Sequence, residues 1–281
     1  MGPTASGKSS LAETIANATD SIIINADAFQ LYRGLDIGTA KPVKRNQYKL
    51  LDIRNPDEEF GVGEFVLLAA DLLKSEFEQG KSVVLCGGTG LYIRALIEEY
   101  KDLMPSPSPE LRAELCNVSL VEAVRKLTKL NPKGALNIDL FNEVRVKRAL
   151  EKVMSDKDPI KFNVPPFVTN KIAIIPPSEV SSSKIEQRTQ EMFQNGWVAE
   201  VKNLLNCGYG PGNPGFRALG YEAIAEYIQE DGNREVLIHR ICSDTVRYAK
   251  RQRTWLRAEP NLVIHTGVNE ATDALEHLWQ K

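Results

Sequence analysis

The chain has 281 residues, of which 42% are hydrophobic and 26% charged, and its formal net charge at pH 7 is −2. This composition is typical of a globular protein and excludes a disordered chain or one that is basic throughout. No apolar run approaches the roughly 20 residues of a membrane-spanning helix, and no charged-then-apolar leader is present. We therefore expect a cytoplasmic protein, a monomer in the absence of any oligomer signal, with a core plus an inserted or appended subdomain.

The cysteines carry no metal or disulfide pattern. Cys86, Cys116, Cys207 and Cys242 are scattered, with no C-x-x-C pair. This spacing argues against a zinc site and against a disulfide framework. We expect buried free thiols.

The chain opens with a glycine-rich motif. Residues 2–9 read G-P-T-A-S-G-K-S and fit the P-loop pattern G-x-x-x-x-G-K-[ST] at every fixed position. Such a loop points backbone N–H groups at phosphate oxygens, at the N-terminus of the helix that follows. Lys8 supplies a mobile positive charge and Ser9 a hydroxyl that can hold Mg²⁺. The motif is typical of nucleotide-binding proteins, including ATP-binding ones, but does not specify the polyphosphate; an ordinary glycine-rich turn is the alternative.

The position of this motif raises a question about the sheet. A P-loop normally follows the C-terminal end of a buried parallel strand, and here only Met1 precedes it. We expect the first strand to be missing from this chain, because no later strand-like segment is spare. The other possibility is that another segment takes its place.

The next segments predict a site at one edge of a parallel sheet. Residues 9–18 are typical of a helix and residues 21–25 of a short buried strand. Asp27 follows that strand, at the edge where open α/β sheets bind ligands, although an Asp that only caps the loop would look the same. The loop 28–42 is too long for a simple connector, and we interpret it as a substrate loop.

A second strand, glycine turn and helix repeat this plan. Residues 50–53 predict a strand, 63–79 an amphipathic helix and 82–86 a buried strand that leads into the turn G-G-T-G at 87–90. Glycines there allow close approach of the backbone to a ligand, and the Thr89 hydroxyl would project at the same edge as Asp27. The alternative is a tight turn in which Thr89 is only a helix N-cap.

From about residue 103 the pattern becomes helical. A proline-rich linker at 104–109 precedes helices at 109–116, 120–130 and 138–154, and strand pattern resumes at 172–175. We expect an α/β core formed by 1–102 and 170–281, interrupted by a helical insertion at 103–169. The basic cluster of Arg145, Lys147 and Arg148 on the last inserted helix is either a solvated face or a contact surface.

The C-terminal part adds helices and one more strand. Helices are predicted at 183–195 and 197–206, then a flexible loop at 207–215, a long helix at 233–256, an edge strand at 261–265 and a last helix at 271–280. The long helix has a core-facing stripe and a basic face. Pairing of that face with carboxylates of the core and contact with a polyanion are both open.

Five segments together resemble the bacterial tRNA dimethylallyltransferase (isopentenyltransferase) family. They are the P-loop with Asp27 and Y-R-G-L-D-I-G-T-A-K-P at 32–42, G-G-T-G-L-Y at 87–92, R-V-K-R-A-L-E at 145–151, P-G-F-R-A-L-G-Y at 214–221 and Y-A-K-R-Q-R-T-W at 248–255. They occur in the expected order over nearly the whole chain. One departure is Ala28, where the family often has Ser.

The resemblance implies a P-loop NTPase-like fold and a prenyl transfer. The five-carbon group of dimethylallyl diphosphate would move to N6 of the adenosine on the 3′ side of the anticodon of tRNA, with Mg²⁺ as cofactor and diphosphate as product. Because an adenine amino group is a poor nucleophile, a carboxylate must take its proton, and we choose Asp27. Phe29 and Gln30 suit a base that is flipped out of the anticodon loop.

By the same resemblance, site residues are predicted at three kinds of position. Catalytic residues are Asp27, Thr89 and Arg217. Diphosphate-binding residues are Thr4, Ala5, Ser6, Gly7, Lys8 and Ser9, with Ser9 also as the metal ligand. The predicted tRNA-binding residues are Asp27, Ala28, Phe29, Gln30, Thr89, Arg112, Val144, Arg145, Val146, Lys147, Arg148, Gly215, Phe216, Arg217 and Tyr221.

Three other functions fit part of the sequence. A small-molecule P-loop kinase shares the loop but should carry an arginine-bearing lid, and the loop 28–42 does not suit it. A nucleotide-binding switch should carry a base-specificity motif such as N-K-x-D, which does not occur. An adenylate isopentenyltransferase, which acts on free AMP, ADP or ATP, is the nearest alternative; the basic helices favour tRNA.

Overall fold

The computed structural model describes residues 1–98, 100, 103–105, 107–230 and 232–279. The chain divides into two compact units, which we describe separately. The first contains Met1–Phe60, Phe65–Glu99 and Asn163–Lys281, and the second contains Gly61–Glu64 and Tyr100–Phe162. Among the described residues, we find no helix with both the length and the apolar character needed to cross a bilayer.

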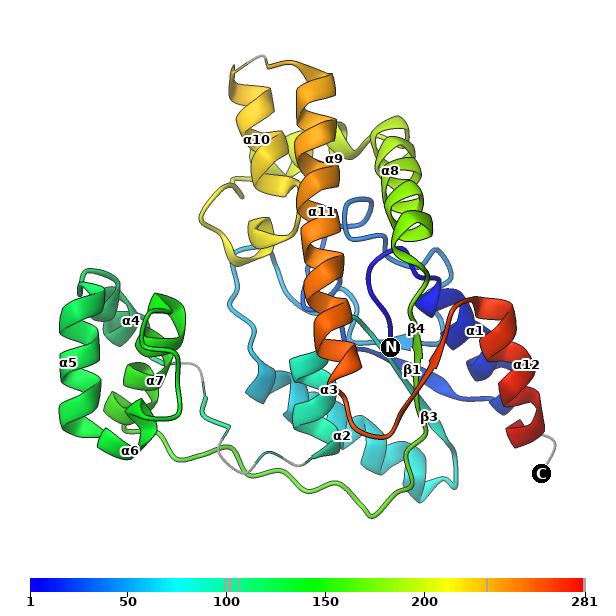
Figure 1. The fold of residues 1–281 in the computed structure, drawn as a ribbon, viewed down its shortest axis with the longest axis horizontal. Coiled ribbons are helices and arrows are strands. Elements are labelled where there is room, and N and C mark those ends of the chain that lie inside the picture. The colour runs from blue at the N-terminus through cyan, green and yellow to red at the C-terminus, as the bar shows by residue number, and fades with distance from the viewer. Residues whose placement is uncertain (99, 101–102, 106, 231, 280–281) are drawn as a thin grey trace. The chain divides into compact units, whose positions relative to one another are not determined.

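The first unit is built on parallel strands (Figure 1). Strand β1 (Ile22–Asn25) lies between β2 (Tyr48–Lys49) and β3 (Val83–Cys86), and β4 (Lys171–Ile174) pairs with β5 (Leu262–His265). All of these pairings are parallel. Apolar residues in succession, as in β1, suit strands that helices cover on both faces. The protein is therefore an α/β protein with parallel sheets and many helices, as predicted.

Helices surround these strands. They are α1 (Lys8–Thr19), α2 (Val62–Glu78), α3 (Gly90–Ile97), α8 (Ser178–Gln194), α9 (Trp197–Asn206), the 3₁₀ helix η1 (Pro214–Arg217), α10 (Tyr221–Glu230), α11 (Arg234–Arg257) and α12 (Val268–Trp279). Helix α1 packs on α12, and α8 packs along α11. The largest apolar cluster centres on the buried rings of Trp197, Phe216 and Tyr221.

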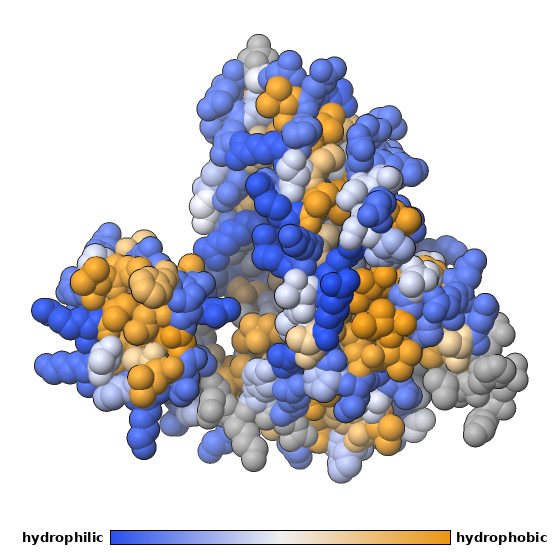
Figure 2. Space-filling view, in the orientation of Figure 1, coloured by the Kyte–Doolittle hydropathy of each residue, from blue (hydrophilic) through white to orange (hydrophobic). Residues whose placement is uncertain are grey.

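The second unit is mainly a small helical bundle. It contains α4 (Pro109–Cys116), α5 (Leu120–Leu130), α6 (Pro132–Ala135) and α7 (Glu143–Met154). Each helix begins at a side-chain cap; for example, the Ser119 hydroxyl accepts a hydrogen bond from the N–H of Glu122. Leu127, Val146 and Leu150 form a core that excludes water completely. Figure 2 shows apolar side chains on the visible face of this unit, and its exposed apolar residues include Phe141 and Val144.

Several predicted elements differ from the structure. The helix expected at 183–195 is α8, which already begins at Ser178. The strand expected at 50–53 is wrong: β2 covers Tyr48–Lys49, and Leu50 and Asp52 have φ values of 65° and 54°. Such left-handed conformations turn the chain and cannot continue a strand. The helix expected at 138–154 begins only at Glu143, because the Asn142 side chain accepts the N–H of Arg145 and caps it there.

The cysteine prediction is correct for one thiol. All four are free, but only Cys86 is buried; Cys116 and Cys207 are exposed, and Cys242 is half-buried. The linker predicted at 104–109 and the helix predicted at 271–280 each include a residue outside the described ranges, Ser106 and Gln280.

Candidate active site

The P-loop sequence forms a tight turn at the start of α1. Ala5 and Gly7 have φ values of 59° and 90°, which bend the backbone sharply. A Cβ atom on Gly2 would lie 2.4 Å from Ser6 Oγ and 2.9 Å from the carbonyl oxygen of Ile174, so glycine is needed there. The hydroxyl of Ser6 is buried and has no hydrogen-bond partner among the described residues. An unpaired buried hydroxyl costs free energy, and a phosphate oxygen would satisfy it.

Three half-buried charged residues interact at this loop: Lys8, Arg188 and Asp27. Burial lowers the pKa of the Lys8 ammonium, and the negative charge of Asp27 opposes this effect. Burial likewise lowers the pKa of Arg188, again opposed by Asp27. Arginine stays protonated at any physiological pH, so Asp27 lies in the field of at least one permanent cation, without a direct ion pair among the described residues. The resulting positive potential suits a polyanion.

Sequence reasoning missed Arg188, which comes from the middle of α8. Its Nη1 donates a hydrogen bond to the Thr4 hydroxyl over 3.4 Å. Ile185 and Thr189, on the same side of α8, are buried against the unit's core. A charged residue on an otherwise buried helix face was the available signal, because such a charge normally needs a partner or a ligand.

Gln252 joins the P-loop to the second glycine turn. This buried side chain on α11 accepts the N–H of Thr4 at its Oε1 over 2.9 Å and donates from its Nε2 to the carbonyl oxygen of Gly88 over 3.0 Å. Both of its polar atoms are therefore used to hold two loops in place. Burial raises the pKa of the Tyr248 hydroxyl, one turn earlier on α11, to about 12.

The structure brings Asp27 and Thr89 to one edge of the sheet. Asn25 and Cys86 are partners in the parallel register of β1 and β3, so the two turns that follow begin side by side. The N–H of Ala28 donates to Thr89 Oγ1 over 3.1 Å. Thr89 occupies the N-cap position of α3 without a side-chain capping bond, so its hydroxyl serves the Asp27 turn instead. Asp27 Oδ1 accepts the N–H of Phe29 over 3.0 Å, which orients the carboxylate.

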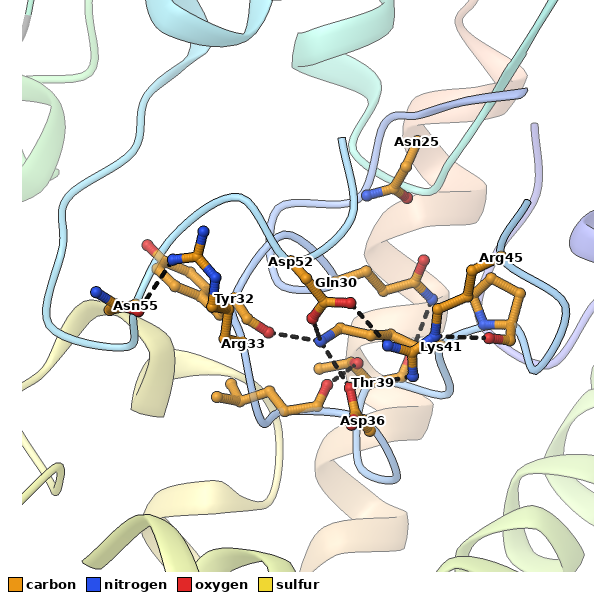
Figure 3. A network of polar contacts seen from close by, with 12 residues as sticks. Asn25, Gln30, Tyr32, Arg33, Asp36, Thr39, Lys41, Arg45, Asp52 and Asn55 are labelled. Carbon is orange, nitrogen blue, oxygen red and sulfur yellow. Dashed lines mark hydrogen bonds and ion pairs between the residues drawn. The ribbon is translucent and has the colours of Figure 1, made fainter. Parts of the chain in front are cut away.

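A buried lysine holds the loop 28–42 in shape (Figure 3). Lys41 Nζ donates to the carbonyl oxygen of Tyr32 over 2.6 Å, to Asp36 Oδ1 over 2.8 Å and to Asp52 Oδ1 over 2.5 Å. The Gln30 side chain donates from its Nε2 to the carbonyl oxygen of Thr39 over 2.9 Å. The amide nitrogen of Gln30 is thus engaged within its own loop.

A glutamate holds the same loop from the other side. Glu200 on α9 accepts the N–H groups of Asp36, Ile37 and Gly38 over 2.9, 2.7 and 3.3 Å, and the Tyr221 hydroxyl over 2.6 Å. A carboxylate that accepts several N–H groups fixes the backbone strongly. Gly38 lies with Thr4, Ala5 and Arg188 around a cavity of about 50 Å³. The loop 28–42, which Glu200 holds in place, therefore forms one wall of this cavity next to the P-loop.

The other predicted site residues differ in how exposed their side chains are. Arg217 is exposed, and its Nη2 lies 3.5 Å from Glu59 Oε1; its catalytic role stays a prediction. Phe216 and Tyr221 are fully buried near Gly215, and Val146 is fully buried in the helical unit. Their side chains therefore pack inside the fold.

The predicted basic cluster of the helical unit lies on α7. Lys147 Nζ lies 2.8 Å from Glu143 Oε1, and Arg148 Nη1 lies 2.7 Å from Glu151 Oε2. Arg112, from α4, has its Nε 3.9 Å from Glu151 Oε1. The cations are thus partly neutralised by carboxylates of the same unit, while Arg145 and Val144 are exposed.

The basic face of α11 is also partly engaged. Arg240 pairs with Glu226 over 2.6 Å, and Arg253 donates to the carbonyl oxygen of Pro176 over 2.8 Å. Arg251 lies over the ring of Tyr248. Pairing within the unit therefore accounts for some of these cations, and contact of this face with a polyanion stays a prediction.

Comparison with known proteins identifies relatives over most of the chain. The sequence profile of the family described as IPP transferase matches residues 30–259. A tRNA dimethylallyltransferase 2 from Geotalea uraniireducens is 36% identical over 92% of this chain and 88% of its own. A tRNA dimethylallyltransferase from Picosynechococcus sp. is 36% identical over 98% of this chain and 94% of its own.

The comparison with solved structures points to the same family. The full-length tRNA isopentenylpyrophosphate transferase from Bacillus halodurans superposes with a TM-score of 0.71 at 30% identity, over 99% of this chain and 92% of that one. A eukaryotic dimethylallyltransferase acting on tRNA has a TM-score of 0.79 over 98% of this chain and 76% of its own, and at 21% identity it supports the fold alone. This chain belongs to the IPP transferase family.

Proposed function

We propose that this chain transfers the dimethylallyl group of dimethylallyl diphosphate to N6 of the adenosine next to the anticodon of tRNA, on its 3′ side. The observation that carries the assignment is that the P-loop with Lys8 and Arg188 and the Asp27–Thr89 turns are close enough for Asp27 to influence both cations. This arrangement provides charge for a departing diphosphate and a base for the attacking amine in one place.

The leaving group needs positive charge. As the bond between the allylic carbon and the diphosphate oxygen breaks, its electron pair and negative charge go to the diphosphate. Lys8, Arg188, the Ser6 hydroxyl and the loop amides from Ala5 to Ser9 are proposed to bind it, with Thr4 contributing through its side chain because its N–H is held by Gln252. Because these donors are held in place before the reaction, they stabilise the transition state without reorganisation.

The nucleophile needs a base. The N6 lone pair forms the new carbon–nitrogen bond, and the N6 proton passes to a carboxylate oxygen of Asp27. The bonds from Phe29 and Ala28 to Asp27 and Thr89 keep this base and the neighbouring hydroxyl oriented. We propose that Thr89 positions the N6 amine, and that Arg217 assists diphosphate binding from its loop.

Mg²⁺ fits as a cofactor in the usual P-loop manner. The Ser9 hydroxyl, in the first turn of α1, is the proposed protein ligand, and diphosphate oxygens and waters would complete the shell, since Mg²⁺ keeps several waters. Among the described residues no group of three or more His, Cys, Asp or Glu side chains is placed to hold a metal without the substrate. When bound, the ion would neutralise diphosphate charge.

The helical unit is proposed to supply RNA contacts, and the boundaries 103–169 of the insertion stay a prediction. Arg145, Arg148, Lys147 and Arg112 offer charge to phosphates, and the exposed Val144 lies beside them. In the α/β core, Ala28, Phe29, Gln30 and Gly215 are proposed to lie along the path of the flipped adenosine. Flipping costs a few kcal/mol, which phosphate contacts would offset.

The direct test is transfer of labelled dimethylallyl diphosphate. Unmodified tRNA, AMP, ADP and ATP are offered in parallel, with and without Mg²⁺. We expect label in tRNA, at the adenosine 3′ to the anticodon. Label in free nucleotide would instead identify an adenylate isopentenyltransferase, and no label from folded protein that binds dimethylallyl diphosphate would refute the transferase assignment.

A further inference from the structure

The two halves of the proposed reaction are carried by different sheets of the α/β unit. Asp27 and Thr89 lie in turns that follow β1 and β3 of the three-stranded sheet. The P-loop follows Met1, whose carbonyl oxygen accepts the N–H of Ile174 in β4 over 3.1 Å. Transfer from the leaving-group site to the nucleophile site therefore requires that these two sets of loops keep one fixed relative position.

Gln252 of α11 hydrogen-bonds to both sets of loops. Its Oε1 accepts the N–H of Thr4 in the P-loop over 2.9 Å. Its Nε2 donates to the carbonyl oxygen of Gly88 over 3.0 Å, in the turn that continues into Thr89. One end of an amide group accepts and the other donates, so the two partners fix which way this amide points. A side chain that only accepts or only donates could make just one of the two bonds.

Packing holds Gln252 at this position. It is 8% exposed, and Ala249 and Leu256, about one turn before and after it on α11, are buried as well. Leu256 belongs to one apolar cluster with Ala173 of β4, so this face of α11 is anchored beside that strand. A Cβ atom on Gly88 would lie 2.4 Å from Gln252 Nε2, so the amide and the glycine turn approach each other closely. The bridge between the loops is therefore short and fixed in place.

The contacts of the glycine turn continue to the proposed base. Thr89 accepts the N–H of Ala28 at its Oγ1 over 3.1 Å, and its own N–H donates to the carbonyl oxygen of Ala26 over 3.2 Å. Ala26 and Ala28 flank Asp27 in the chain. The turn that Gln252 holds thus supports the backbone on both sides of the carboxylate.

From these contacts we propose that Gln252 is a positioning residue for the transfer, an inference that rests on the proposed function. It sets the distance and direction between the diphosphate in the P-loop and the adenosine amine at Asp27. The reacting carbon and nitrogen must approach to about 3–3.5 Å with correct alignment, and a misplacement of about 1 Å costs about a hundredfold in rate. Both polar atoms of Gln252 are used by Thr4 and Gly88, so it acts on the rate through these two loops.

The test compares the unchanged chain with Gln252→Met and Gln252→Glu. Methionine is similar in length and makes neither bond, whereas an ionised glutamate keeps only the acceptor for the Thr4 N–H. We expect kcat for transfer to tRNA to fall about 10²-fold in Gln252→Met and at least about tenfold in Gln252→Glu. The Kd values of dimethylallyl diphosphate and of tRNA should change less than about threefold, because the groups that bind them remain.

The matched control is Gln190→Met, at an exposed position of α8, which should transfer at the rate of the unchanged chain. Single-turnover transfer of labelled dimethylallyl diphosphate gives the rate, equilibrium binding gives the two Kd values, and thermal unfolding gives Tm. If Gln252→Met fails to fold, Gln252→Glu, which keeps the bond to Thr4, serves for the same comparison.

The split between rate and affinity separates positioning from a purely structural role. A lower Tm with both substrates bound more weakly in proportion to the loss of rate would overturn the proposal. A rate for the Gln252 variants equal to that of an active unchanged chain would overturn it too, and would leave the proposed function intact. No transfer by the folded, unchanged chain would refute the proposed function itself, and with it this role of Gln252.

Discussion

The P-loop region of the α/β unit and the surface of the helical unit both collect cations, but in different environments. Lys8 and Arg188 are half-buried and, within the described ranges, neither lies within 4.0 Å of a carboxylate oxygen. Lys147 and Arg148 each pair with a glutamate on their own helix. Half-buried charge acts strongly at short range, whereas surface charge is screened by salt. The half-buried cations at the P-loop therefore suit stabilisation of charge in a chemical step, and the surface cations of the helical unit suit long-range attraction of RNA.

Removal of the proposed base should have the largest effect. Asp27→Asn keeps the shape of the side chain and its acceptor oxygen for the Phe29 N–H, but it removes the proton acceptor. We expect kcat to fall about 10²- to 10⁴-fold, with dimethylallyl diphosphate binding little changed. Single-turnover transfer and equilibrium binding measure the two effects.

The matched control for this change is Asp71→Asn, at an exposed position of α2. It should leave kcat unchanged. Unchanged turnover in Asp27→Asn would remove Asp27 as the base.

Replacement of the half-buried Arg188 should have the second-largest effect on the rate. Arg188→Gln removes one of the two cations that face Asp27 and weakens the bond to Thr4. We expect kcat to fall about 10²- to 10³-fold, because a preorganised partner of the leaving group is lost. The loss should be nearly the same at low and high salt, since the site is partly shielded from solvent.

Lys184→Gln, one turn away on the exposed side of α8, is its control and should behave as the unchanged chain. If the two variants have equal rates, Arg188 has no role in diphosphate stabilisation.

The smallest effect is expected in the helical unit. Arg145→Ala combined with Arg148→Ala should weaken tRNA binding about tenfold near 0.1 M salt and reduce the slope of log K against log salt by about 1 to 2. At saturating tRNA the rate should be unchanged, because these residues act on attraction. Filter binding at several salt concentrations gives the slope.

Arg125→Ala with Lys129→Ala provides a control of equal charge on α5 of the same unit, where both residues are exposed. If the slope of log K against log salt is identical in the two double variants, the cations of α7 contribute no more to tRNA binding than those of α5.

Much of the local structure could be predicted from the sequence. The helices at Pro109–Cys116, Leu120–Leu130 and Trp197–Asn206 begin and end where their caps and glycines predict. Asn142 could have been recognised as a cap, which would have corrected the start of α7. The left-handed conformation of Leu50 could not, because a leucine rarely adopts it without tertiary contacts.

By itself, the sequence determined the glycine turns, the P-loop and the order of strands and helices, because φ preference, capping and apolar periodicity are local properties. Only the tertiary structure decided which distant side chains complete the site. Gln252 reaches Thr4, Arg188 reaches the same loop, and Glu200 reaches the N–H groups of residues 36–38. Each contact joins helices and loops far apart in the chain, and its geometry follows from how the helices pack on the sheets rather than from any pattern of neighbouring residues.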